Sequence, residues 1–306
     1  MRGLILAATI AASCSVAAAE VPSTLTILEG EALIVRGSGR VHAAEGVRLS
    51  PGDIVETGAS TFAQVELSDQ SVVQFGPSTR VMINGSTAKS KPERWLYLME
   101  GWMKMSGAKR DAASGPPFDL RAPLFEIPAN PGVVVLRATP GELNLFVERG
   151  DARLAERHPG AQPTMVSLRA GDYYRRKAPA RGSVNPGPMQ AFLGDMPRFF
   201  RDSLPLRIDR YRDHPVQPKE APDFAYADVE AWLKAEPSVR RPLMQRWRGK
   251  AREQAFRTAL IANLSAHPEW DPILFPEKYK PKEPPAPPRG TVAVTRPAPA
   301  ASTASP

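Results

Sequence analysis

Cysteine is nearly absent from this sequence, since Cys14 is the only one in 306 residues. It lies in an N-terminal segment with a positive start, an apolar run over Leu4–Ala12 and an A-x-A site at Ala17–Ala19, which together predict a signal peptide over residues 1–19. Cleavage after Ala19 leaves a chain without thiols, and this excludes disulfides, thiolate metal sites and a cysteine nucleophile. We therefore expect a periplasmic protein. A lipoprotein anchored through Cys14 is the less favoured alternative, because Ala11 stands where a large aliphatic residue is usual.

Long apolar runs are also lacking after the predicted signal, so we expect no transmembrane span and only weak contact with a membrane surface.

Gly-x-Ser-x-Gly, His-Glu-x-x-His and phosphate-binding glycine motifs are absent. The four histidines are His42, His158, His214 and His267. None pairs with another ligand at metal-binding spacing. We therefore expect no catalytic, cofactor-binding or metal site and no enzymatic activity. An envelope hydrolase, which would need an acid pair or a Ser/His pair in a deep cleft, is a third alternative.

Charge of one sign is not concentrated in this chain. Lys and Arg number 40 against 32 Asp and Glu, giving a net charge of +8, and the only local basic cluster is Arg175-Arg176-Lys177 with Arg181. Nucleic-acid binders usually concentrate positive charge in a stripe, so we expect no nucleic-acid partner. The excess of positive charge is consistent with weak attraction to anionic envelope polymers or lipid headgroups, or with a role in solubility alone.

Short β segments separated by turn residues fill residues 24–178. Ala63, Val65 and Leu67 alternate with polar residues, the period of a half-buried strand, and Asp69-Gln70 interrupts the run as a hairpin would. A glycine followed by an aspartate ends a strand at Asp53 and again at Asp172, in a faint internal repeat. Glycine adopts positive φ and aspartate caps backbone N–H groups, so we expect turn roles for both aspartates, with ligand roles as the alternative.

The spacing of apolar residues changes from that of strands to that of helices after residue 178, and this change predicts an α+β chain. We expect a mainly antiparallel β domain over 24–178, as a sandwich or rolled sheet, then a linker over 179–189. Apolar residues at helical spacing predict a small α-helical region over 190–280. Its aromatic stripe is expected to pack, with a ligand groove as the alternative. Residues 281–306 are rich in Pro and Ala and predict a disordered tail.

The β region resembles the FecR-type periplasmic domain over residues of about 28–175. The resemblance depends on turn residues: Gly52-Asp53, Thr57-Gly58, Asp69, Ser71, Pro77 and Ser78. It implies a binding or signalling module. Gln70 departs from the Asp-Gly that is usual in the family, and this favours a different turn because Gln adopts positive φ less readily than Gly. Transmembrane regulators of this type have an inner anti-sigma segment before a membrane span, where this sequence has a predicted cleavable signal, so we do not expect direct control of transcription.

The function we expect is a non-catalytic interaction or scaffold module that docks to another envelope protein. Loops on a rigid scaffold commonly carry binding, which makes Lys89–Glu93 and Gly107–Pro117 the candidate contacts. The alternative is a protein that binds a glycan, either peptidoglycan or an exported polysaccharide. Aromatic residues that could stack on sugar rings are Trp95, Tyr97, Trp102, Tyr173 and Tyr174. Trp95 and Tyr97 share one face of a predicted strand, so burial in the core is the competing interpretation.

Overall fold

The computed structural model describes residues 23–67, 69–85, 94–107, 117–128, 132–158 and 160–280. The predicted signal peptide, the predicted tail and the loop Lys89–Glu93 lie outside the described residues. Of the other loop, only Gly107 and Pro117 are described. These assignments stay predictions.

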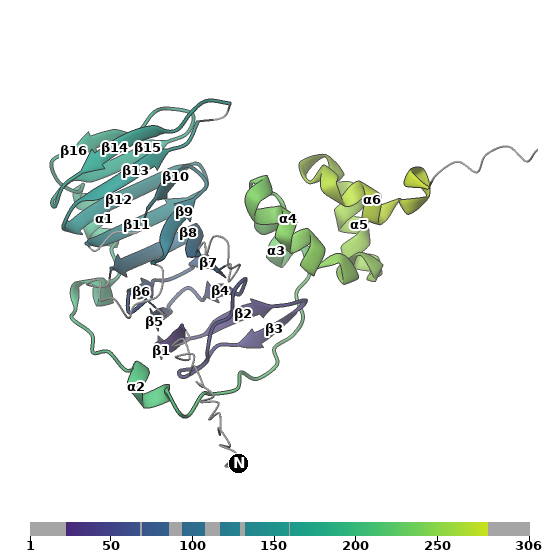
Figure 1. Cartoon of the computed structure of the whole chain (residues 1–306), viewed down its shortest axis with the longest axis horizontal. Helices are drawn as coiled ribbons and strands as arrows, with labels where there is room; N and C mark the ends of the chain where they lie inside the picture. Colours follow the sequence, from purple (N-terminus) through teal and green to yellow (C-terminus); the bar gives the residue numbers. More distant parts are fainter. Residues whose placement is uncertain are drawn as a thin grey trace, which may run out of the picture.

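In the described part of the chain, sixteen strands build two β-sheets that face each other (Figure 1). The strands are β1 (Thr24–Glu29), β2 (Ala32–Arg36), β3 (Gly39–His42), β4 (Ile54–Thr57), β5 (Phe62–Glu66), β6 (Val72–Phe75), β7 (Arg80–Gly85), β8 (Arg94–Ser106), β9 (Asp119–Ala122), β10 (Phe125–Ile127), β11 (Val133–Thr139), β12 (Glu142–Arg149), β13 (Ala152–Glu156), β14 (Thr164–Leu168), β15 (Tyr173–Lys177) and β16 (Ser183–Asn185). Sheet A runs β1-β5-β6-β8-β11-β12-β15-β16, and sheet B runs β3-β2-β4-β7-β8-β9-β10-β13-β14. Among the pairings of the described strands, only that between β8 and β9 is parallel. The predicted, mainly antiparallel sandwich is confirmed.

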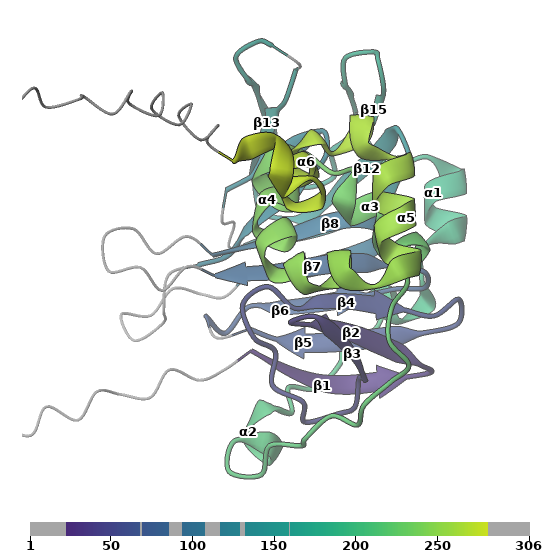
Figure 2. The ribbon, with the colours of Figure 1, turned by 90° about the vertical axis from the view of Figure 1, so that its right-hand side faces the viewer.

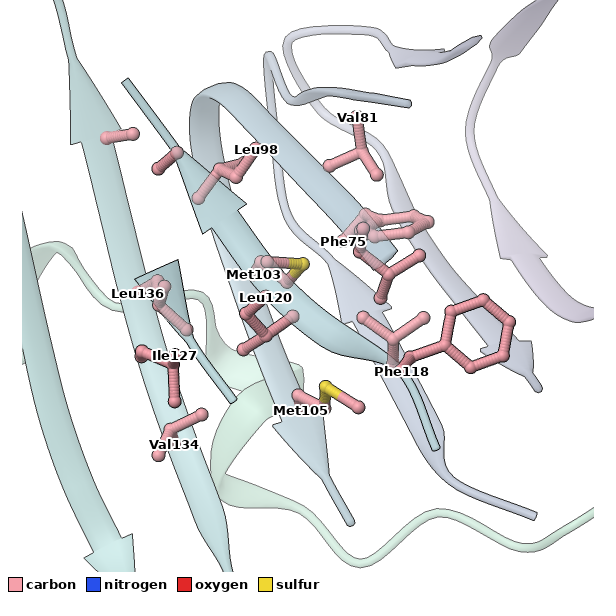
Figure 3. Packing of buried hydrophobic residues seen from close by; sticks show 14 of the residues in the cluster. Phe75, Val81, Leu98, Met103, Met105, Phe118, Leu120, Ile127, Val134 and Leu136 are labelled. Carbon is pink, nitrogen blue, oxygen red and sulfur yellow. The ribbon is translucent and has the colours of Figure 1, made fainter. Parts of the chain in front are cut away.

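The main core lies between the two sheets. Strands of sheet A contribute Phe75, Met103 and Leu136, and strands of sheet B contribute Val81 and Leu98, all with their side chains in the shared interior (Figure 3). These residues are completely buried. Strand alternation explains the arrangement, because every second residue of each strand faces the opposite sheet.

One strand, β8, belongs to both sheets and changes sheet at Gly101. Gly101 has φ +98°, and a Cβ atom there would lie 2.4 Å from Cα of Thr79. The Thr79 hydroxyl accepts from the N–H of Trp102 (2.9 Å) and donates to the carbonyl of Gly76 (2.9 Å). Thr57 donates to the same carbonyl (2.7 Å). Thr57 and residues 76–79 therefore stabilise, through these hydrogen bonds, the point at which β8 passes from sheet B to sheet A, so their role is structural.

The two Gly-Asp pairs form equivalent turns. Asp53 Oδ2 accepts from the N–H of Ser50 (2.8 Å), and Asp172 Oδ2 accepts from the N–H of Arg169 (2.7 Å). The preceding glycines have φ +88° and +93°. The predicted turn roles of Asp53 and Asp172 are confirmed, and Asp53 additionally pairs with Arg36 at 2.6 Å.

At the β5–β6 hairpin, Gln70 itself adopts φ +67°, the left-handed conformation that glycine takes more readily. The expected difference in turn type stays a prediction. Asp69 explains why the positive φ of Gln70 is tolerated. Its carboxylate is buried, and it accepts from the N–H of Ser71 (2.9 Å), from the Ser71 hydroxyl (3.0 Å) and from the N–H of Phe118 (3.3 Å).

Helices follow the β region, but not immediately after residue 178, because β16 occupies part of the expected linker. The helices are α1 (Gln190–Asp195), η1 (Arg198–Arg201), α2 (Ile208–Tyr211), α3 (Tyr226–Leu233), α4 (Pro237–Arg246), η2 (Arg248–Arg252), α5 (Gln254–Ala262), η3 (Leu264–Ala266), η4 (Pro268–Trp270), α6 (Asp271–Leu274) and η5 (Pro276–Tyr279). None of the described helices has the length and apolar character needed to cross a bilayer.

The C-terminal half wraps the sandwich in three steps. First, α1 and η1 pack on the outer face of sheet A, where Phe192 and Phe200 contact Trp102. Second, residues 202–225, here called the strap, pass around the end of the sandwich formed by β1 and β3 (Figure 1). Third, residues 226–280, here called the helical lobe, pack on the outer face of sheet B (Figure 2). The aromatic stripe of the helices is therefore packed, as expected.

Backbone hydrogen bonds hold the strap against the β1/β3 end. The N–H of Ala221 donates to the carbonyl of Arg40 (3.0 Å), and that of His42 donates to the carbonyl of Lys219 (2.8 Å). At the start of the strap, Glu66 accepts from the N–H of Arg207 (2.6 Å). The strap thus pairs with β3, the edge strand of sheet B, and covers it.

Candidate docking edge

The aromatic residues that suggested sugar stacking are all buried. Trp95, Tyr97, Trp102, Tyr173 and Tyr174 are between 0% and 7% exposed. Burial raises the pKa of Tyr97 and of Tyr174. The first two side chains lie under the helical lobe, the next two under α1, and Tyr174 lies in the main core. None offers a ring face to a sugar, so the aromatic basis of the glycan alternative was wrong.

The predicted basic cluster is largely neutralised. Arg175 donates to Glu142 (2.9 Å), and this contact lowers the pKa of the Glu142 carboxyl. Arg176 is 4% exposed and lies 3.3 Å from the equally buried Glu156. Only Lys177 and Arg181 remain as exposed cations of the cluster. It is therefore chiefly a structural feature of β15.

Metal-binding side chains do not gather in the part of the chain that the structure describes. No group of three or more His, Cys, Asp or Glu side chains there is arranged to hold a metal ion. His267 is completely buried in the helical lobe, with Nε2 3.1 Å from the hydroxyl of Tyr226. Burial lowers the pKa of His267 and raises that of Tyr226 to about 12, so both groups are neutral core residues near pH 7.

The Asp53 turn is not accessible either. Arg246 of α4 donates to the carbonyl of Gly52, and Trp247 donates to the carbonyl of Gly37 (2.9 Å). A Cβ atom on Gly52 would overlap the Arg246 guanidinium. The turn is thus a docking point for the helical lobe, and its Gly52 and Asp53 are buried.

The opposite end of the sandwich is open. Sheet B ends at β14 and sheet A at β16, and among the described residues no further strand pairs with either (Figure 1). β16 has only three residues, whereas β14 has five, Thr-Met-Val-Ser-Leu, in register with β13 from Ala152↔Leu168 to Glu156↔Thr164. We call β14 the docking edge.

The docking edge lacks the usual protection of an edge strand. Natural sheets block their edges with charges, proline or bulges, or cover them with other elements. β14 contains no charge, proline or glycine, and no bulge interrupts its pairing with β13. Met165 is 59% exposed on its outer face, while Val166 packs partly on the main core. The outward N–H and C=O groups of β14 are therefore available for a further strand.

Positive charge flanks the docking edge. Arg153 lies directly opposite Ser167 in the β13–β14 register, and Arg169 follows β14. Both are exposed, and neither forms an ion pair with any described residue. A strand added to β14 would therefore meet two free guanidinium groups, which favours a partner with acidic side chains. The sequence analysis missed this site, although the uncharged run between Pro163 and Arg169 was a signal for it.

Comparisons with known proteins identify a family for part of the chain. Residues 53–153 match the family model described as FecR protein. No curated protein matches the chain. Two crystal structures of a candidate anti-sigma factor from Parabacteroides distasonis are similar to it. The first has 16% sequence identity and a TM-score of 0.37, and the match covers 46% of this chain and 64% of that chain. The second has 14% sequence identity and a TM-score of 0.36, and the match covers 44% of this chain and 59% of that chain. The chain thus spans less than two thirds of each. The docking edge and the helical lobe lie outside the matched residues.

Proposed function

We propose that this chain, which carries a FecR domain over residues 53–153, is a non-catalytic interaction module of the bacterial periplasm that binds another envelope protein. β14 accepts an extended, acidic segment of that partner by strand addition. The observation that supports this most is the asymmetry of the sandwich. Its β1/β3 end is covered by the strap, while β14 at the other end is uncharged and has no described strand on its outer side.

Strand addition at β14 has a sound energetic basis. Each main-chain hydrogen bond contributes about 0.5–1.5 kcal/mol net, and a five-residue edge offers several. Burial of Met165 adds about 1.5–3 kcal/mol at most. Charge pairs with Arg153 and Arg169 raise the rate of association more than the affinity. Together these contributions suit a reversible complex.

The proposed compartment depends on the predicted signal peptide over residues 1–19. Export of the mature chain is a prediction of this function, and detection of the processed form in the periplasmic fraction would support it. With a FecR domain outside the cytoplasm, the chain would act as a sensor or scaffold through protein contacts. No observation on the described residues favours glycan binding over this function.

In-cell cross-linking tests the function directly. A photo-reactive amino acid replaces Met165 in one variant and Ile261 in a control, since Ile261 is an exposed apolar residue of the helical lobe. We expect protein adducts from position 165 and few from 261. Ser167→Glu, which places an acid on the exposed outer face of the edge and repels an acidic partner, should abolish the adducts from 165, and Ile261→Glu should not. Equal yields at both positions, or adducts that survive Ser167→Glu, would overturn the proposal. Retention on purified sacculi through a high-salt wash would favour the glycan alternative.

A further inference from the structure

A second basic cluster, not recognised from the sequence, lies in the helical lobe over α4 and η2. Residues 237–252 contain six Lys and Arg residues and no Asp or Glu. The whole lobe, residues 226–280, contains ten Lys and Arg residues against seven Asp and Glu, which gives it a net charge of +3. Which surface of the lobe is positive therefore depends on which of these cations lack a partner.

Each of the seven carboxylates in the lobe already has a cationic partner. A Lys or Arg nitrogen lies within 3.8 Å of an oxygen on Asp228, Glu230, Glu236, Glu253, Glu269, Asp271 and Glu277. Two cations of the cluster take part in these pairs. Arg240 donates to Glu269 (2.7 Å) and lowers the pKa of that carboxyl, and the buried Lys250 pairs with Glu253 (3.0 Å). Neither contributes free positive charge to the surface.

Three other arginines of the cluster are exposed. Arg248 and Arg252 form no ion pair with any residue in the described part of the chain. Arg241 is 67% exposed, and its Nε lies 3.8 Å from Oε1 of Glu269. Because Arg240 lies closer to the same oxygen, at 2.7 Å, two cations share one carboxylate. We call Arg241, Arg248 and Arg252 the arginine stripe, whose charge is not fully cancelled by any described carboxylate.

The arginine stripe lies on the solvent side of the lobe. Residues four or seven positions apart share one face of a helix, and the stripe has this spacing. Gln245 and Gly249 between these arginines are also exposed, whereas Leu243 and Trp247 are buried in the apolar core of the lobe. Arg246 points the other way and donates to the turn beneath the lobe. The stripe is the outside of a helical segment rather than a pocket, so it suits a broad anionic surface better than a small free anion.

We propose that the arginine stripe binds the surface of an anionic phospholipid membrane. A guanidinium group donates two parallel hydrogen bonds to a phosphate, and lipid headgroups present many phosphates in one plane. The exposed neighbours Gln245 and Gly249 offer no aromatic ring for stacking on a sugar, which favours headgroups over a glycan. The contact is separate from the docking edge, since β14 is not part of the lobe, so a membrane-bound chain keeps β14 available for its protein partner.

Co-sedimentation with lipid vesicles tests the proposal. The chain is used in the processed form that we expect, without residues 1–19, so that the apolar run of the signal does not insert into the bilayer. We expect binding to vesicles of phosphatidylcholine mixed with phosphatidylglycerol, which is anionic, and no binding to vesicles of phosphatidylcholine alone. Binding should weaken as the salt concentration rises, because the charges of the stripe are exposed to solvent.

Neutral substitutions separate the stripe from the overall charge of the chain. Each basic residue near an anionic membrane strengthens binding roughly 5-fold, so the loss of three should weaken binding roughly 100-fold. The triple variant carries Arg241→Gln, Arg248→Gln and Arg252→Gln. The matched control removes the same charge from three exposed arginines outside the lobe that have no described ion partner, through Arg149→Gln, Arg181→Gln and Arg198→Gln. The control should bind nearly as tightly as the unaltered chain.

A chemical footprint covers the case in which the triple variant fails to fold. Anionic vesicles added to the unaltered chain should protect the arginine stripe from modification by phenylglyoxal and leave Arg149 as reactive as before. Equal binding to both kinds of vesicle, equal weakening in the triple variant and its control, or modification of the stripe that vesicles do not change would each overturn the proposal. Retention on purified sacculi that the triple variant loses, with its vesicle binding unchanged, would overturn it in favour of an envelope polymer.

Discussion

Gly101→Ala should destabilise the protein far more than the same change at another glycine with positive φ. Gly101 has φ +98° and Gly141 has φ +76°, so alanine at either position acquires left-handed strain of about 1–2 kcal/mol. The surroundings differ. A Cβ atom on Gly141 would meet nothing within 4 Å, whereas one on Gly101 would lie 2.4 Å from both Cα and Oγ1 of Thr79. The pair therefore separates backbone strain from close packing.

The extra loss of stability in Gly101→Ala follows from the hydrogen bonds that the Thr79 hydroxyl makes. To admit a methyl group, Thr79 must move by about 1 Å, since ordinary carbon contacts are near 3.5–4.0 Å. The hydrogen bonds of its hydroxyl group with the N–H of Trp102 and the carbonyl of Gly76 would then weaken, and each contributes about 0.5–1.5 kcal/mol to stability. We expect losses in the free energy of unfolding of about 1–2 kcal/mol for Gly141→Ala and about 2–5 kcal/mol for Gly101→Ala.

Urea denaturation followed by tryptophan fluorescence and circular dichroism measures both variants. A difference between the two losses of less than about 0.5 kcal/mol would refute the reasoning, because the crossover of β8 would then tolerate a side chain that the structure has no room for.

Three further predictions concern buried polar groups and the hairpin. Because burial lowers the pKa of His267, the unfolded chain binds a proton that the folded chain does not, so the free energy of unfolding should fall as pH drops below about 6.5. His267→Gln should flatten this dependence in denaturation curves at about pH 7 and about pH 5, and an unchanged slope would contradict it. Gln70→Gly should raise the midpoint of urea unfolding, with a gain of about 1 kcal/mol from removal of the left-handed strain, and a loss would show that the turn is not strained. Arg176→Met should lower the free energy of unfolding by about 3–5 kcal/mol in the same assay, because Glu156 would keep a buried charge without its partner, and a neutral effect would refute the buried ion pair.

Local pattern predicted the strands and turns of this protein well. Alternation at Ala63–Leu67 and the Gly-Asp pairs at Asp53 and Asp172 reflect short-range rules, namely strand periodicity and the positive φ of glycine. The helical spacing after residue 189 reflects the same kind of rule. The stop of α1 at Asp195, just before Met196-Pro197, follows from the geometry that proline imposes.

Features that depend on long-range contacts were not predictable in this way. Whether Trp102 faces a sugar or a helix depends on where α1 returns to sheet A, some 90 residues later in the chain. The hydrogen bonds of the Gln64 side chain depend likewise on Gln74 of the next strand and on Pro205 of the strap, which lies 141 residues later in the chain. The docking edge depends on which strands end the sheets, and the order of strands is not encoded in local periodicity.

Hydrogen exchange across β14 is the measurement that tests the docking edge most directly. The purified chain is compared alone and in complex with the envelope protein captured from position 165, and exchange of residues 164–168 is followed by mass spectrometry. Strand addition predicts slower exchange of the outward-facing N–H groups of β14 in the complex, with the helical lobe unchanged, because new main-chain hydrogen bonds form only at the edge. Protection of the helical lobe or of the outer face of sheet A, with β14 exchanging as it does in the free chain, would contradict the account.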